Sequence, residues 1–267
     1  MIRYGLDTLY PIIYVESEQN FWVEVEKHTH GRHYRDLRQN IKGTIESVRH
    51  KLNIVRYSAG LIQTLSEDDY AEFKTPLFPS KLKISTAKYQ DRCTFEMHNQ
   101  NEYRLFLTLF VENFSAASFS LFDVCGYLIR YLVSESTDGT QIAYWNSVDL
   151  VKGYPQLYKF LCKYKTTYKN TPPPNQVDWI DPLNKLRNHM THRPITEIFH
   201  EKSPNNKIYN QTIESFLLDR TIFGNQQKDE ELKAFVKTCF DGIEDFVSQF
   251  YEHLINEIQA VQAVPIQ

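Results

Sequence analysis

Three side chains that could together act on a phosphodiester lie close in the sequence, at Arg187, Asn188 and His192. The guanidinium of arginine is always charged and can hold a phosphate, whereas histidine titrates near neutral pH and can move a proton. Asp181, Lys185, Asn188 and His192 follow one another at steps of four, three and four residues, which places them on one helix face. This combination is suited to phosphodiester chemistry that needs no metal ion.

The proline at position 194 limits how far this helix extends. Proline disfavours helical backbone at the preceding residue, so we expect the helix to end near His192. Arg187 lies roughly 100° around the helix from Asn188, and it converges with His192 only if the helix end bends. The proline supplies a cause for such a bend, and we interpret this helix end as a candidate catalytic site.

The same residues also fit a purely structural role. Arg187 can pair with Asp123 or Glu112, two acids in the most apolar predicted helix, and such an ion pair would fix how the helices pack. His192 can then interact with the carbonyl end of its own helix. The sequence leaves both interpretations open, and Asp123 and Glu112 are candidate supporting residues.

The stretch 154–193 is basic, with a local net charge of +5, although the whole chain has a net charge of −3. A basic segment with interleaved tyrosines can bind the phosphates of RNA and stack on unpaired bases. An ordinary solvated helix face with half-buried tyrosines has the same pattern. The candidate RNA-binding residues are Lys159, Lys163, Tyr164, Lys165, Lys185 and Arg193.

Histidines at His28, His30 and His33 have a spacing at which imidazoles can bind zinc or nickel. They surround Gly31, and no cysteine or carboxylate cluster accompanies them, which favours a solvated loop over a metal site. The chain also lacks the glycine-rich sequences of nucleotide-binding loops and the G-x-S-x-G of many hydrolases. We therefore predict no metal and no cofactor.

Composition is that of a packed protein, with 42% hydrophobic and 14% aromatic residues. Four cysteines without a C-x-x-C pair fit a reduced, cytoplasmic setting. The most apolar run, 105–133, is interrupted by polar residues, so we predict a buried core helix and no membrane span. The interrupting residues are Glu112, Asn113, Asp123 and Arg130.

Apolar residues at steps of three and four predict an all-α fold with long connections. Because each apolar face needs a partner, we expect one domain over 1–267, an elaborated four-helix bundle. Shorter helices are expected near 17–28 and 155–168. Insertions at 66–100 and 195–225 carry short hairpins, at 82–97 and around 213–223. The long helices are expected at about 34–65, 101–134, 177–192 and 228–260.

Arg187-Asn188-x-x-x-His192 resembles the R-polar-x-x-x-H signature of the HEPN superfamily, all-α proteins many of which are metal-independent ribonucleases. The apolar segment 119–129 resembles the second helix of such bundles, which places an acidic or polar side chain near the signature. The resemblance implies a four-helix core and a homodimer that brings two signatures together across a cleft. It implies RNA cleavage through the 2′-hydroxyl, in which Arg187 stabilises the phosphate, His192 is the acid or base and Asn188 is a positioning residue.

The chain departs from the minimal family pattern through its size, its two insertions and the proline directly after the signature. The sequence thus predicts an RNA-binding, HEPN-like protein, with endoribonuclease activity in a defence or toxin-type system. The alternative is a non-catalytic helical module that binds another protein and in which Arg187 and His192 are structural.

Overall fold

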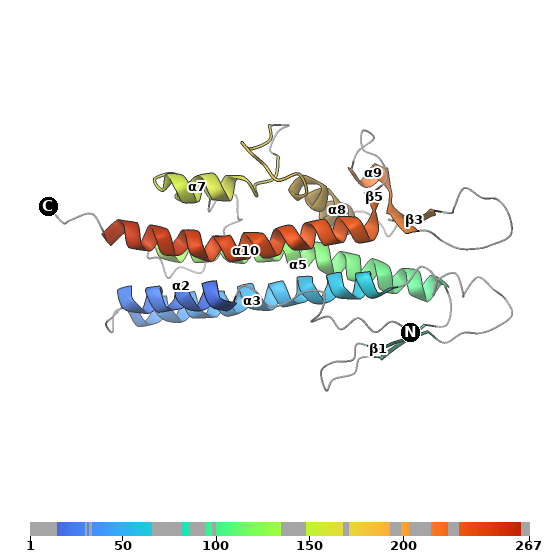
Figure 1. Ribbon diagram of the computed structural model, residues 1–267, viewed down its shortest axis with the longest axis horizontal. Coiled ribbons are helices and arrows are strands. Elements are labelled where there is room, and N and C mark those ends of the chain that lie inside the picture. Colours follow the sequence, from blue (N-terminus) through green and yellow to red (C-terminus); the bar gives the residue numbers. More distant parts are fainter. Residues whose placement is uncertain are drawn as a thin grey trace. The chain divides into compact units, whose positions relative to one another are not determined.

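The computed structural model is mostly helical (Figure 1). The residues that it describes are 15–29, 31, 34–65, 82–85, 94–97, 100–134, 148–167, 171–192, 199–202, 215–223 and 230–262. Its helices are α2 (Val15–His28), α3 (Arg35–Thr64), α5 (Gln100–Ser134), α7 (Pro155–Cys162), α8 (Ile180–His192), α9 (Arg220–Phe223) and α10 (Leu232–Gln262). The all-α prediction is confirmed, and each of the four predicted long helices is present.

Some helix ends differ from the predicted ones. Helix α8 begins at Ile180, three residues later than expected, and ends at His192 as the following proline predicted. Helix α7 ends at Cys162 instead of near position 168. Beyond the Pro172-Pro173-Pro174 segment, the Val177 amide donates to the carbonyl of Lys163, the residue that follows α7, at 2.9 Å.

The strands confirm one hairpin prediction and contradict the other. Strands β1 (Leu82–Ser85) and β2 (Thr94–Met97) pair antiparallel, as expected. The hairpin predicted around 213–223 is not formed, because Arg220–Phe223, which would be its second strand, is helix α9, and β4 (Ser215–Leu218) pairs elsewhere. It lies between β3 (Phe199–Lys202) and β5 (Glu230–Glu231) in an antiparallel sheet. The chain leaves β4 through Asp219, whose Oδ1 accepts the Thr221 amide at 2.7 Å and starts α9.

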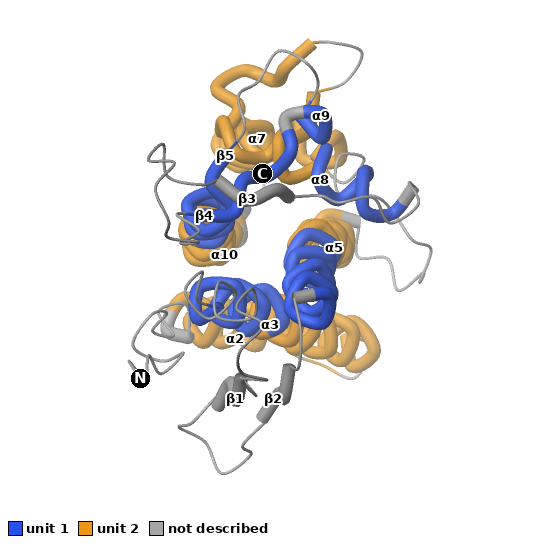
Figure 2. The backbone as a smooth tube through the Cα atoms, turned by 90° about the vertical axis from the view of Figure 1, so that its right-hand side faces the viewer, with its two compact units in different colours: residues 1–11, 54–116, 185–240 blue, residues 12–53, 117–184, 241–267 orange. Residues whose placement is uncertain are grey.

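The chain forms two compact units, each assembled from separate segments (Figure 2). Unit 1 contains 1–11, 54–116 and 185–240, and unit 2 contains 12–53, 117–184 and 241–267. The boundaries fall inside α3, α5, α8 and α10, so each of these helices contributes one segment to each unit.

The core of unit 2 is an aromatic cluster around Phe246 of α10. Its ring centroid lies 4.7 Å from that of Phe122 of α5 and 4.7 Å from that of Tyr164, just after α7. Phe160 of α7 stacks on it at 5.8 Å. Such pairs contribute about 1 kcal/mol each beyond the burial of their area. Together they fix α5, α7 and α10 of this unit against one another.

Helix α2 is held in unit 2 by an apolar and an ionic contact. The rings of Phe21 and Tyr251 of α10 are 5.3 Å apart. Glu18 is only 2% exposed, and its carboxylate accepts hydrogen bonds from the guanidinium of Arg49 on α3. A buried carboxylate needs such a partner, because an isolated charge in this setting is costly.

In unit 1, α3, α5 and α10 segments are joined by side chains from several elements. Gln63 of α3 donates to the Lys233 carbonyl of α10 at 2.7 Å. The ring of Tyr103 of α5 lies 5.9 Å from that of Phe216 in β4. Phe223 of α9 contacts Phe235 of α10 at 5.6 Å. The three-stranded sheet is thereby attached to the helices of its own unit.

Helix α5 is long and apolar enough to cross a membrane by length and composition alone. Its most apolar window lies within Asn101–Val133, with a mean hydropathy of 1.5, and 56% of that window is buried within the protein. The core helix of a soluble protein has the same composition. Leu105 and Leu109, which are 53% and 41% exposed, lie on its outward face.

Two helical glycines differ in the space around them. A Cβ atom at Gly242 of α10 would lie 2.3 Å from Trp179 Nε1, whereas a Cβ at Gly43 of α3 would meet no atom within 4 Å. Trp179 is itself placed against Phe122 and Tyr164, at centroid distances of 6.4 and 6.1 Å. The indole of Trp179 can therefore move away from a new methyl group only by disturbing the aromatic cluster.

Gly242→Ala is expected to lower the free energy of unfolding by about 1–3 kcal/mol, because the clash outweighs the better helix propensity of alanine. Gly43→Ala is the matched control and is expected to raise it by up to about 1 kcal/mol. Urea denaturation followed by circular dichroism measures both. Equal stabilisation by the two substitutions would contradict the packing of Trp179 on Gly242.

Candidate functional site

The candidate catalytic residues lie in the last two turns of α8. Three buried side chains, Ile180, Leu183 and Leu186, form the apolar face of this helix. Asp181 in its first turn accepts hydrogen bonds from the amide of Thr167, at 2.8 Å, and from the Thr167 hydroxyl. An acidic residue in a helix's first turn also interacts favourably with the helix dipole. The start of α8 is therefore anchored.

Arg187 and Asn188 are both half-buried and contact each other directly. Arg187 Nη1 donates to Asn188 Oδ1 at 3.4 Å, and the Thr191 hydroxyl donates to the Arg187 carbonyl at 2.8 Å. The guanidinium thus reaches the Asn188 side chain across the separation of roughly 100° between neighbouring helix positions. The backbone of α8 reaches His192. The His192 side chain lies outside the described part of the structure, so its approach to Arg187 stays a prediction.

The candidate supporting acids lie at different positions on α5. Glu112 is exposed. Asp123 is half-buried, and its charge acts on two neighbours in unit 2. Burial and, second, the Asp123 carboxylate raise the pKa of Cys125 and of Tyr127. Arg130 opposes the effect of Asp123 at Tyr127, so the two charges partly offset each other on this segment of α5.

Lys185, a candidate RNA-binding residue, holds a structural contact. Its Nζ donates to the Phe223 carbonyl at 2.9 Å. Phe223 is the last residue of α9, so the lysine satisfies a carbonyl at a helix end. Lys185 thereby fixes α9 to α8 within unit 1.

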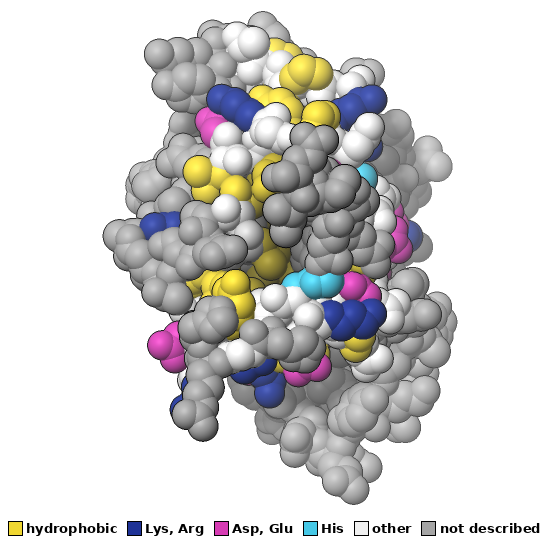
Figure 3. Space-filling model, turned by 90° about the vertical axis from the view of Figure 1, so that its left-hand side faces the viewer, with side chains coloured by type: hydrophobic (Ala, Val, Ile, Leu, Met, Phe, Trp, Pro, Cys, Tyr) yellow, Lys and Arg dark blue, Asp and Glu magenta, His cyan; other side chains and the backbone are white. Residues whose placement is uncertain are grey.

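The basic residues around α7 have different environments. Lys159 is exposed and Lys163 is half-buried. Lys165 Nζ lies 3.5 Å from Asp149 Oδ1, which partly neutralises it. Arg193 lies outside the described residues. On the face of the molecule drawn in Figure 3, the coloured Lys and Arg side chains stand apart, among acidic and hydrophobic ones.

Tyr164 belongs to the core and does not present its ring to a ligand. It is 5% exposed and packs against Phe122, Phe160, Trp179 and Phe246. Burial and the charge of Asp245 raise the pKa of its phenol to about 12. A ring covered by four aromatic neighbours cannot stack on a base, so Tyr164 is removed from the candidate RNA-binding set.

Within the described ranges, no three His, Cys, Asp or Glu side chains are grouped as metal ligands would be. His28 Nε2 lies 3.5 Å from Glu24 Oε2, one turn earlier on α2. His30 and His33 lie outside those ranges. The described cysteines, Cys125, Cys162 and Cys239, are buried and form no disulfide.

His253 of α10 is a titratable group that the sequence patterns did not single out. Its ring stacks on Phe160 at a centroid distance of 4.3 Å. Burial and the charge of Lys163 lower the pKa of His253, whereas Glu252 and Glu257 raise it, and the net direction is downward. The folded protein therefore favours the neutral ring.

His253 is expected to make the protein less stable in acid. As pH falls below about 6.5, the ordinary histidine pKa, the unfolded chain takes up this proton before the folded chain does. Its contribution to stability is thus present above that pH and is lost as pH falls through the lower folded-state pKa. His253→Phe keeps a ring on Phe160 and cannot titrate, so the free energy of unfolding should fall less between pH 7.5 and 5.5. An identical decrease in both proteins would contradict this assignment.

Comparison of the chain with known protein families, curated proteins and solved structures finds no match to a family model, a protein or a structure.

Proposed function

We propose that the protein is a HEPN-like, RNA-binding endoribonuclease that acts without a metal ion as a cytoplasmic homodimer in a defence or toxin-type system. The observation that carries the proposal is the Arg187–Asn188 contact at the end of α8, four residues before the helix ends at His192. An Arg-polar-x-x-x-His sequence in a mostly helical protein supports it.

The three side chains have complementary roles in this reaction. The ribose 2′-hydroxyl loses its proton and attacks phosphorus, the bond from phosphorus to the 5′-oxygen breaks, and a 2′,3′-cyclic phosphate forms. His192 moves a proton to or from these oxygens, and Arg187 stabilises the added negative charge on the phosphate. Asn188 holds one N–H of the guanidinium and so orients its planar group.

The purified protein is expected to cut single-stranded RNA in the presence of a chelator and to leave 2′,3′-cyclic phosphate ends. Mass spectrometry of the fragments identifies these ends, and light scattering of the same sample measures whether the protein is a dimer. The matched substrate is a 2′-O-methyl RNA of the same sequence, which lacks the attacking hydroxyl. Intact RNA after prolonged incubation, or equal cleavage of both substrates, would contradict the proposal.

A second candidate function is a non-catalytic module that binds another protein. Leu105 and Leu109 favour it, because two large apolar side chains one turn apart are exposed on α5. In this case Arg187 and Asn188 serve the packing of α8, and no RNA sequence is cut. The chelator assay therefore separates the two functions.

A further inference from the structure

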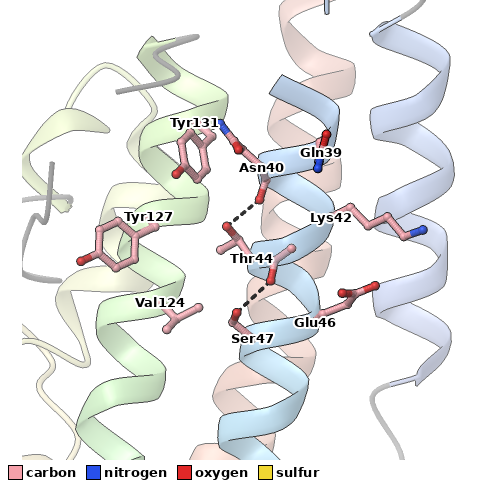
Figure 4. Close-up of a pocket in the computed structure, with 10 residues that line it drawn as sticks. Gln39, Asn40, Lys42, Thr44, Glu46, Ser47, Val124, Tyr127 and Tyr131 are labelled. Carbon is pink, nitrogen blue, oxygen red and sulfur yellow. Dashed lines mark hydrogen bonds between the residues drawn. The ribbon is translucent and has the colours of Figure 1, made fainter. Parts of the chain in front are cut away.

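A groove of about 780 Å³ lies between α3 and α5, entirely within unit 2 (Figure 4). This volume is in the range of small-molecule sites. The α3 wall is built from small and polar residues, and the α5 wall carries two tyrosines one turn apart. The lining includes Asn40, Gly43, Thr44, Ser47, Tyr127 and Tyr131.

The α3 wall of the groove is rich in neutral hydrogen-bonding groups. The Thr44 hydroxyl donates to the Asn40 carbonyl at 2.7 Å, and the Ser47 hydroxyl donates to the Gly43 carbonyl at 2.8 Å. Each hydroxyl proton is thus used inside the helix, and each hydroxyl oxygen keeps acceptor capacity. The side-chain amide of Asn40 can both donate and accept hydrogen bonds. This wall suits a ligand edge that carries both kinds of group.

The charged residues of the lining are directed elsewhere. In Figure 4, the Lys42 and Glu46 side chains extend from α3 away from Tyr131, whereas the Asn40 side chain points toward α5. The two charges are of opposite sign, so they add no net charge to the groove. The space near Asn40 and Tyr131 is therefore more suitable for a neutral polar group than for a phosphate.

The α5 wall supplies aromatic surface. The Tyr131 ring lies on the side of the groove that the Asn40 amide faces (Figure 4). Burial, Asp123 and Tyr131 raise the pKa of Tyr127, and Arg130 lowers it, with an upward net direction. Its phenol therefore stays protonated at neutral pH. A flat aromatic surface beside a carboxamide is the combination by which proteins bind unpaired bases, and asparagine pairs best with the edge of adenine.

We propose that this groove binds one unpaired adenine base of a single-stranded nucleic acid. The base stacks on the Tyr131 ring, its edge pairs with the Asn40 amide, and the sugar and phosphates stay outside. Gly43, one of the lining residues, leaves space in the α3 wall, since a Cβ there would meet no atom within 4 Å. The inference rests on the proposed RNA function and deepens it by naming the part of the RNA that is recognised.

The test uses 2′-O-methyl hexa-adenylate, which has RNA geometry but no attacking hydroxyl, so binding is measured without cleavage. A hexamer with the same backbone and no bases is the matched ligand. We expect the abasic hexamer to bind at least about tenfold more weakly, as measured by fluorescence anisotropy. Equal binding of the two hexamers, or no binding of hexa-adenylate at millimolar protein, would overturn the proposal.

Variants locate the binding in the groove. Gly43→Phe adds a large ring to the α3 wall of the groove, and Tyr131→Ala removes the stacking surface while leaving α3 unchanged. Each is expected to weaken hexa-adenylate binding about tenfold, whereas Tyr131→Phe, which keeps a ring, should bind almost as well as the wild type. The control is Gly153→Phe, at a second glycine with open space around its Cβ position and outside the groove lining.

Wild-type affinity in Tyr131→Ala with wild-type helicity would overturn the proposal even if Gly43→Phe failed to fold. Failure of the ribonuclease proposal is distinguishable. A protein that leaves RNA intact but discriminates between the hexa-adenylate and abasic hexamers lacks the catalytic function and retains the base site. A protein that cuts RNA but binds both hexamers equally has the catalytic function and lacks the base site.

Discussion

Replacing Arg49 by methionine is expected to lower the free energy of unfolding by about 1–3 kcal/mol, because a buried carboxylate loses its partner although the arginine side chain itself is 48% exposed. The Glu18 side chain is only 3% exposed, and the guanidinium of Arg49 is the cation that contacts its carboxylate. Methionine retains much of the side-chain length of arginine but leaves the carboxylate buried without that charge. Urea denaturation at pH 7, followed by circular dichroism, measures the loss.

Two comparisons show whether burial causes this effect. The cations of the two pairs are similarly exposed, at 57% for Lys27 and 48% for Arg49, but Glu24 is 15% exposed and also lies near His28, so Lys27→Met should cost less than about 0.5 kcal/mol. The double variant Glu18→Met/Arg49→Met removes both charges and should regain most of the stability that Arg49→Met loses. Similar small losses in Arg49→Met and Lys27→Met would contradict a buried, ion-paired carboxylate.

The long helices could be predicted because their signal is repeated many times along the chain. In α10, apolar residues recur at helical spacing from Leu232 to Leu254, and the buried positions follow that spacing. One atypical residue changes such a pattern little. The ends depend on single local features instead, such as the proline after α8, which correctly predicted the end of that helix.

The buried positions of Glu18 and Tyr164 were not predicted, although the spacing of apolar residues around each indicated them. Glu18 precedes Phe21 and Val25 by three and seven residues, so it lies on the apolar face of α2, and all three are buried. Tyr164 similarly follows Phe160 and Leu161 on the apolar face of its segment. Periodicity was therefore a better guide to the place of Tyr164 than the basic residues around it.

Contacts between distant segments had no such signal. Strand β4 pairs with β3 and β5, and a four-residue strand carries too little information to select its partner. Trp179 lies on Gly242 although the two are far apart in the chain, and the groove joins α3 to α5. These features depend on how helices pack, which spacing within one helix does not specify.

Arg187→Ala and His192→Ala are each expected to reduce RNA cleavage by at least about 100-fold. Loss of the guanidinium removes the group that stabilises the phosphate, and loss of the imidazole removes the proton carrier. Arg187→Lys should retain partial activity, since the ammonium keeps the charge but not the planar fork that Asn188 orients. Initial cleavage rates in chelator, measured on a defined single-stranded RNA, give these values.

Lys185→Gln separates catalysis from packing, because Lys185 lies on the same helix and binds the Phe223 carbonyl. It should lower the free energy of unfolding by about 1 kcal/mol and leave kcat almost unchanged, whereas loss of a contact with RNA would raise KM. The catalytic assignment requires the opposite result from Arg187→Ala and His192→Ala. Each should lose most of the cleavage rate, keep native helicity and change the free energy of unfolding only slightly. If Arg187→Ala instead loses stability and leaves any RNA cleavage unchanged, Arg187 is a packing residue of α8 and the cleavage arises elsewhere.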